Sequence, residues 1–168
     1  MELLIPGLVL VALMIYASTR IKKSAAAAYE SETIETDDFV LFKPAGFLAV
    51  IGGDPRYAFE AYSKEFGTED ASDIRKATVH LTVYDSQNAA FVPYNTDSIL
   101  REETEEINGR EYQMTESQRK VRDIDLRVLR KAGAKSGRLV VLEVVLLNET
   151  TDEFLADIES MLQSFELK

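Results

Sequence analysis

The chain has 168 residues, a formal net charge of -10 and no cysteine. The lack of cysteine excludes disulfides, thiolate nucleophiles and thiolate zinc sites. The acidic balance argues against a general nucleic-acid binder, because such a surface repels phosphate groups. With 46% hydrophobic residues the chain can bury a core, and its length suits one domain beside one membrane segment.

The first feature along the chain is an uncharged apolar run from Leu3 to Thr19. It is just long enough to span a bilayer as a helix, although a buried core helix is the alternative. The bases Arg20, Lys22 and Lys23 follow the run, whereas a cleaved signal peptide begins with them. We therefore expect residues 1–23 to form a single-pass transmembrane anchor with a basic flank in the cell (inner) membrane, and the flank predicts a cytoplasmic domain.

Residues 24–38 change from alanine-rich to acidic without an apolar period, which is typical of a linker. The soluble domain is then expected over residues 39–168. Its first apolar stretches, residues 39–42 and 47–51, flank a Pro-Gly turn and predict a hairpin.

A helix is expected next, over residues 54–67, where Asp54 supplies an N-cap and large apolar residues recur at helical spacing. Residues 78–84 then alternate with a period of two, which predicts a strand. Residues 86–98 have no clear period and favour a loop or a short helix start.

The second half of the domain begins with two runs, residues 102–107 and 110–115, around Asn108-Gly109, the dipeptide best suited to a two-residue hairpin. Residues 124–129 alternate as a half-buried strand that is expected to end at Arg130, where a base falls on the apolar face. The following apolar runs predict a central strand over residues 139–148 and an amphipathic helix that begins with a Thr150 and Glu153 capping box.

This layout resembles the PsbP-like family. The similar features are KPAGF at Lys43–Phe47, the Asn108-Gly109 hairpin, and the strand and helix of LEVVLLNETTDEFLADIESMLQSFEL over residues 142–167. The resemblance implies an α+β domain, a mainly antiparallel sheet packed between helices in an α/β/α sandwich. It also implies a role in binding or assembly, because the family is largely non-enzymatic, and it transfers no site residues.

Candidate chemistry is sparse in the sequence. His80 is the only histidine and is expected to be structural, since it has no histidine partner and no G-x-S-x-G motif is present. The Gly52-Gly53-Asp54 turn lacks the lysine of a phosphate loop, and the glutamates of residues 102–106 lack the spacing of a calcium loop. We predict no catalytic residue, no metal and no cofactor.

The most suggestive feature is a basic segment, residues 119–138, which carries eight Arg or Lys against two aspartates in an otherwise acidic domain. Two interpretations remain open: the bases pair across strands with the acidic hairpin, or they dock an acidic partner or an anionic membrane leaflet. The residues of the candidate partner-binding patch are Arg119, Lys120, Arg122, Arg127, Arg130 and Lys131.

From these features we expect a membrane-anchored, non-catalytic accessory or scaffold protein that binds a protein partner and no nucleic acid. The alternative is a membrane-tethered ligand-binding or sensor module, and an enzyme of unrecognised type comes third.

Overall fold

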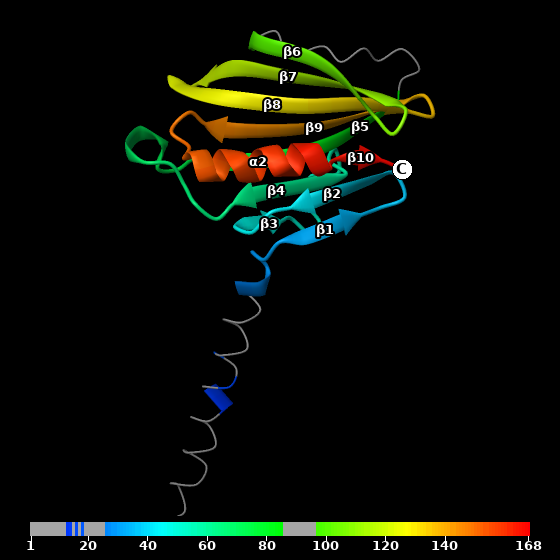
Figure 1. Ribbon diagram of the computed structural model, residues 1–168. Coiled ribbons are helices and arrows are strands. Elements are labelled where there is room, and N and C mark those ends of the chain that lie inside the picture. The colour runs from blue at the N-terminus through cyan, green and yellow to red at the C-terminus, as the bar shows by residue number, and fades with distance from the viewer. Residues whose placement is uncertain (1–12, 15, 17, 19–25, 86–96) are drawn as a thin grey trace, which may run out of the picture.

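The computed structural model describes residues 13, 14, 16, 18, 26–85 and 97–168, and it is dominated by β-strands (Figure 1). The elements in chain order are β1 (Glu32–Glu35), β2 (Phe39–Lys43), β3 (Phe47–Ala49), β4 (Phe59–Ser63), the 3₁₀ turn η1 (Glu69–Ala71), β5 (Ala77–Asp85), β6 (Ser98–Ile107), β7 (Arg110–Val121), β8 (Ile124–Lys135), β9 (Arg138–Leu147), α2 (Asp152–Ser164) and β10 (Glu166–Leu167).

Seven strands form one antiparallel sheet in the order β3-β4-β5-β9-β8-β7-β6. The predicted central strand over residues 139–148 is confirmed as β9, which pairs with β5 on one side and β8 on the other. The short strand β3 and the ten-residue strand β6 form the two edges of this sheet.

A smaller sheet of three strands, in the order β1-β2-β10, lies beside the large one (Figure 1). Its strand β1 falls within the segment expected to be a linker. Lys43, at the end of β2, is fully buried, and its Nζ donates to the carbonyl oxygen of Phe47 at 2.8 Å and to that of Glu30. This ammonium group therefore ties the chain before β1 to the start of β3.

The helix α2 packs its apolar side against the large sheet and β2. Its residues Ile158, Met161 and Leu162 are buried in one core cluster with alternate residues of β5 and β9, among them Leu81 and Leu142. The N-cap is Thr151, one residue after the expected Thr150, and its side chain accepts a hydrogen bond from the backbone N–H of Phe154. Each large apolar side chain buried here stabilises the domain by about 1.5–3 kcal/mol.

The expected α/β/α sandwich is wrong. Within residues 29–85 and 97–168, α2 is the only α-helix, and the second helix expected over residues 54–67 is instead a loop followed by β4. Phe59 is spaced for either structure, but Phe59, Ala61 and Ser63 are buried while Glu60 and Tyr62 are less so, which is the period of a strand. Pairing with β5 on one edge and β3 on the other decided the outcome.

The expected transmembrane anchor is not supported either. No helix among the described residues is long and apolar enough to cross a membrane. Most of the apolar run, and the flanking Arg20, Lys22 and Lys23, lie outside the described residues.

Among the other local predictions, two are confirmed and two are wrong. The Asn108-Gly109 hairpin is confirmed, with both residues at positive φ and strands longer than expected. The strand over residues 78–84 is confirmed as part of β5. The first hairpin is wrong, because β2 and β3 belong to different sheets. Strand β8 does not end at Arg130 but continues to Lys135.

Candidate functional site

Polar residues form a row across the large sheet on the face away from α2. The strand register aligns Glu60 with His80, His80 with Glu143, Glu143 with Arg130, and Arg130 with Thr115. Their apolar neighbours in β5 and β9, which alternate with them, face α2 instead. The row therefore places ionisable side chains from four strands next to one another.

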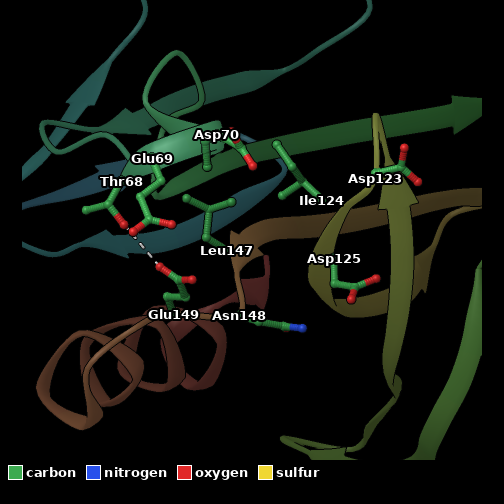
Figure 2. Close-up of a pocket in the computed structure, with 10 residues that line it drawn as sticks. Thr68, Glu69, Asp70, Asp123, Ile124, Asp125, Leu147, Asn148 and Glu149 are labelled. Atoms are coloured by element: carbon green, nitrogen blue, oxygen red, sulfur yellow. Dashed lines mark hydrogen bonds between the residues drawn. The ribbon is translucent and has the colours of Figure 1, made fainter.

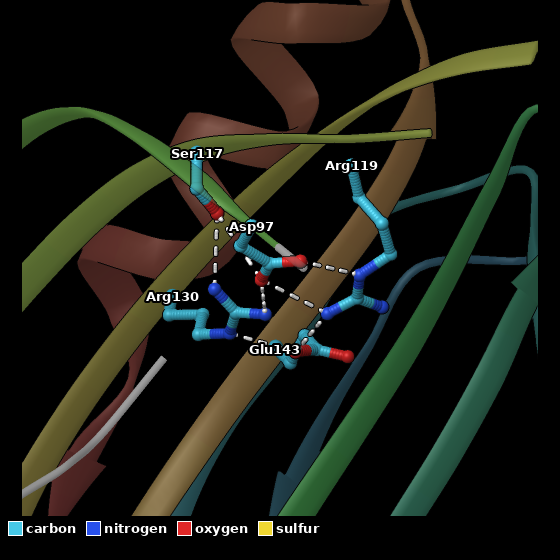
Figure 3. Close-up of polar contacts among 5 residues, drawn as sticks. All are labelled: Asp97, Ser117, Arg119, Arg130 and Glu143. Atoms are coloured by element: carbon cyan, nitrogen blue, oxygen red, sulfur yellow. Dashed lines mark hydrogen bonds and ion pairs between the residues drawn. The ribbon is translucent and has the colours of Figure 1, made fainter. Parts of the chain in front are cut away.

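The centre of this row is an ion-pair network (Figure 3). The guanidinium of Arg130 donates to Glu143 Oε2 at 2.7 Å, to Ser117 Oγ at 3.0 Å and to Asp97. The side chain of Arg130 is 1% exposed and that of Asp97 is 0% exposed. Arg119 completes the network through Asp97 Oδ1 at 2.8 Å and Glu143 Oε2 at 3.4 Å. Two arginines and two carboxylates thus balance each other, so that none of these charges lies in the sheet without compensation.

The pKa values of Asp97 and Arg119 follow from these contacts. Burial tends to raise the pKa of Asp97, but hydrogen bonds from Arg119 and Arg130 outweigh it and hold that pKa below its usual range. The hydrogen bond to Asp97 raises the pKa of Arg119. Asp97 and Arg119 are therefore both charged at neutral pH, and Arg119 donates hydrogen bonds that Asp97 accepts. These contacts suit a structural role, in which the network holds β7, β8 and β9 to Asp97.

His80 lies next to this network. Its ring stacks on Tyr57 with centroids 4.2 Å apart, and its Nε2 is 3.8 Å from Glu60 Oε1. Burial lowers the pKa of His80, although the carboxylates of Glu143 and Glu60 act in the opposite direction. His80 is therefore neutral at pH 7, and its structural role stays a prediction.

A second candidate site is an acidic pocket of about 290 Å³ between η1, the β7–β8 turn and the end of β9 (Figure 2). Ala71, Ile124 and Leu147 contribute its apolar lining. Its acidic lining residues are Glu69, Asp70, Asp123, Asp125 and Glu149. In the part of the chain that the structure describes, no three Asp, Glu or His side chains converge closely enough to hold a metal ion. We therefore assign no metal to this pocket.

The structure separates the residues of the predicted basic patch. Arg119 and Arg130 are in the buried network, and the fully buried Lys131 pairs with Glu105 on the opposite face of the sheet at 2.9 Å. On the surface, Arg127 pairs with Glu116 at 2.7 Å. The two most exposed bases of the patch pair at longer distances, Lys120 with Asp123 at 3.4 Å and Arg122 with Asp73 at 3.6 Å.

The patch residues therefore do not form one continuous surface. Of these contacts, only the pair of Lys131 with Glu105 joins a base to the acidic hairpin, as one of the two interpretations expected. Docking by the exposed members of the patch stays a prediction.

Sequence reasoning did not find the network, although two signals pointed to it. Arg130 interrupts the apolar face of an alternating strand, and Glu143 interrupts the apolar run of the central strand. A charge inside each of two buried strands requires a partner, and the two charges are opposite. Asp97 gave no such signal, because it lies in a stretch without a period.

The comparisons with known proteins show a likeness in fold alone. No protein-family model and no curated protein matches the sequence. Among solved structures, cyanobacterial PsbP (CyanoP) from Synechocystis sp. PCC 6803 is similar with a TM-score of 0.57 and 12% identity, over 83% of this chain and 92% of that chain. LpqN of Mycobacterium tuberculosis, described as involved in cell envelope biogenesis, is similar with a TM-score of 0.59 and 9% identity, over 83% and 91%.

The resemblance to the PsbP-like family is thus confirmed at the level of the fold: the chain has a PsbP-like fold. At such low identity, this likeness carries no function and no site residue from those proteins to this one.

Proposed function

We propose that this protein is a non-catalytic accessory protein that binds a protein partner. The observation that carries the proposal is how the charges are distributed after ion pairing. The ionisable groups at the centre of the large sheet, the buried Arg130 and the half-buried Glu143 among them, are engaged with one another and hold strands together. The remaining surface is acidic, as the lining of the 290 Å³ pocket illustrates.

Uneven surface charge of this kind favours association with partners of opposite charge, because it steers the encounter and fixes the orientation of the complex. We therefore expect the partner to present a basic surface. The PsbP-like fold of CyanoP and LpqN is compatible with this role, and LpqN's described involvement in cell envelope biogenesis makes an assembly process a reasonable setting for the first tests.

The test is crosslinking of the full-length protein in its native cells, followed by purification. A partner recovered in fixed stoichiometry, crosslinked through a Lys- or Arg-rich surface, is the expected result. Repeated recovery of the protein alone would contradict the proposal.

Charge reversal of the two exposed bases, Lys120→Glu with Arg122→Glu, tests the basic patch in the same assay. A partner with a basic surface should be recovered with this variant as well as with the unaltered protein. Loss of recovery at unchanged stability would show that the patch meets an acidic surface, and it would contradict the expected basic partner.

A further inference from the structure

Strand β6 forms an open edge of the large sheet. It is ten residues long, and eight of these residues are exposed. Its inner side pairs with β7, and among the described residues no strand pairs with its outer side. Such an edge offers unpaired backbone groups to any extended chain of suitable side-chain chemistry.

The hairpin geometry identifies the backbone groups that are available. In a two-residue hairpin, the closing pair, here Ile107 and Arg110, exchanges both backbone hydrogen bonds. The pairing alternates from there along the strand, and the register shift lies further back, between Ile99 and Arg101. The N–H and C=O groups of Glu102, Thr104 and Glu106 therefore point away from β7.

The side chains of this edge set the chemistry of its occupant. Glu103 pairs with Arg101 and Glu105 pairs with Lys131, so both of these carboxylates are used within the sheet. Glu102 and Glu106 lie on the other face, where, within the described part of the chain, the hydrogen bond to Glu102 comes from the neutral amide of Gln113. Because a neutral donor leaves the carboxylate charge uncompensated, this face of the edge is acidic.

A second copy of the chain is a poor occupant of the edge. If two β6 strands paired antiparallel about Thr104, Glu102 of each copy would face Glu106 of the other. Like charges directly opposite each other destabilise a strand pair, whereas lysine or arginine at those positions would stabilise it. At the far end of β6, the exposed side chains of Ile99 and Leu100 offer an apolar contact.

We infer that β6 binds an extended basic segment of a partner protein, which adds to the large sheet as an eighth, antiparallel strand with Lys or Arg facing Glu102 and Glu106. This inference rests on the proposed function, since it identifies the surface and the chemistry through which an accessory protein of this kind recognises its partner.

The experiment uses full-length, isotope-labelled protein and a short acetylated and amidated peptide of alternating lysine and threonine. On peptide binding, the amides of Glu102, Thr104 and Glu106 are expected to shift and to exchange with solvent more slowly, while amides of Glu103 and Glu105, already bonded to β7, change little. The double variant E102K/E106K is expected to weaken binding by about tenfold, because two cross-strand charge pairs become repulsive.

The double variant E69K/D70K is the matched control. It makes the same change in net charge at the acidic pocket, away from β6, and is expected to bind the peptide nearly as well as the unaltered protein. Thr104→Pro removes an outward N–H that does not bond to β7 and should abolish binding. If that variant does not fold, E102K/E106K still tests the inference.

Three results would overturn the inference: no peptide binding to the unaltered protein, equal binding by E102K/E106K, or loss of binding in E69K/D70K alone. The last would assign the peptide to the acidic pocket. If crosslinking in cells still recovers a partner whose contacts lie elsewhere, the accessory function stands and only the role of β6 falls.

Discussion

Replacing Arg130 by methionine keeps an unbranched apolar stem but removes the guanidinium that contacts Glu143, Ser117 and Asp97. Breaking a buried ion pair typically costs about 3–5 kcal/mol, because the partner charge stays buried without compensation. Here Arg119 still contacts both carboxylates, so we expect a loss near the lower end, about 3 kcal/mol.

Urea unfolding of the full-length protein, followed by circular dichroism, measures this loss directly. For a small domain whose unfolding free energy falls by roughly 2 kcal/mol per molar urea, the midpoint should drop by about 1.5 M. Arg101→Met is the matched control, because Arg101 forms an ion pair at 66% side-chain exposure and should matter far less.

A double variant separates the charge from the packing. Combining Arg130→Met with Glu143→Leu replaces an ion pair by two apolar side chains, and the second change should recover part of the loss, with a coupling energy of about 1–3 kcal/mol. An Arg130→Met variant as stable as Arg101→Met, or strict additivity in the double variant, would refute the structural role of the network.

Three further predictions concern single residues. Because burial lowers the pKa of His80, the unfolded chain binds a proton more readily, so stability should fall as the pH is lowered through about 6.5, and His80→Gln should flatten this dependence. Gly133→Ala should cost about 1–3 kcal/mol, since the added Cβ would lie 2.9 Å from the ring of Tyr112. Thr151→Ala should cost about 1 kcal/mol, because it removes the cap of α2.

Urea unfolding at several pH values tests all three. His80 is the only histidine, so a change of stability between pH 5.5 and 7 that persists in His80→Gln would contradict the assignment of this pH dependence to His80. For Gly133, an alanine variant of unchanged stability would mean that Tyr112 moves aside without cost. For Thr151, substitution by serine should restore the stability that alanine loses, since serine also caps.

The sequence predicted the structure best where a local rule allows only one backbone conformation. Asn108-Gly109 adopts positive φ at both positions, which few other pairs do cheaply, and the hairpin followed. The apolar stripe of α2 and its threonine cap are likewise properties of the segment itself, and only the capping residue shifted, to Thr151. The fold resemblance was recognisable for the same reason, because it rested on these segments.

The spacing from Phe59 to Phe66 was ambiguous, because large residues at intervals of three and four also satisfy parts of a two-residue period. The neighbours β3 and β5 decided in favour of a strand by taking up its backbone hydrogen bonds. Because this segment is not a helix, one of the two helical layers of the expected α/β/α sandwich is missing.

The candidate sites depended still more on tertiary structure. The sequence by itself determined the acidic balance, the isolated His80, and the two charges at Arg130 and Glu143 that interrupt buried strands. Only the strand register brought those charges together and added Asp97 to them. The physical reason is that the alternation of apolar residues along one strand already shows that a charge will be buried. The opposite charge that compensates it comes from whichever strand or loop the fold places beside it.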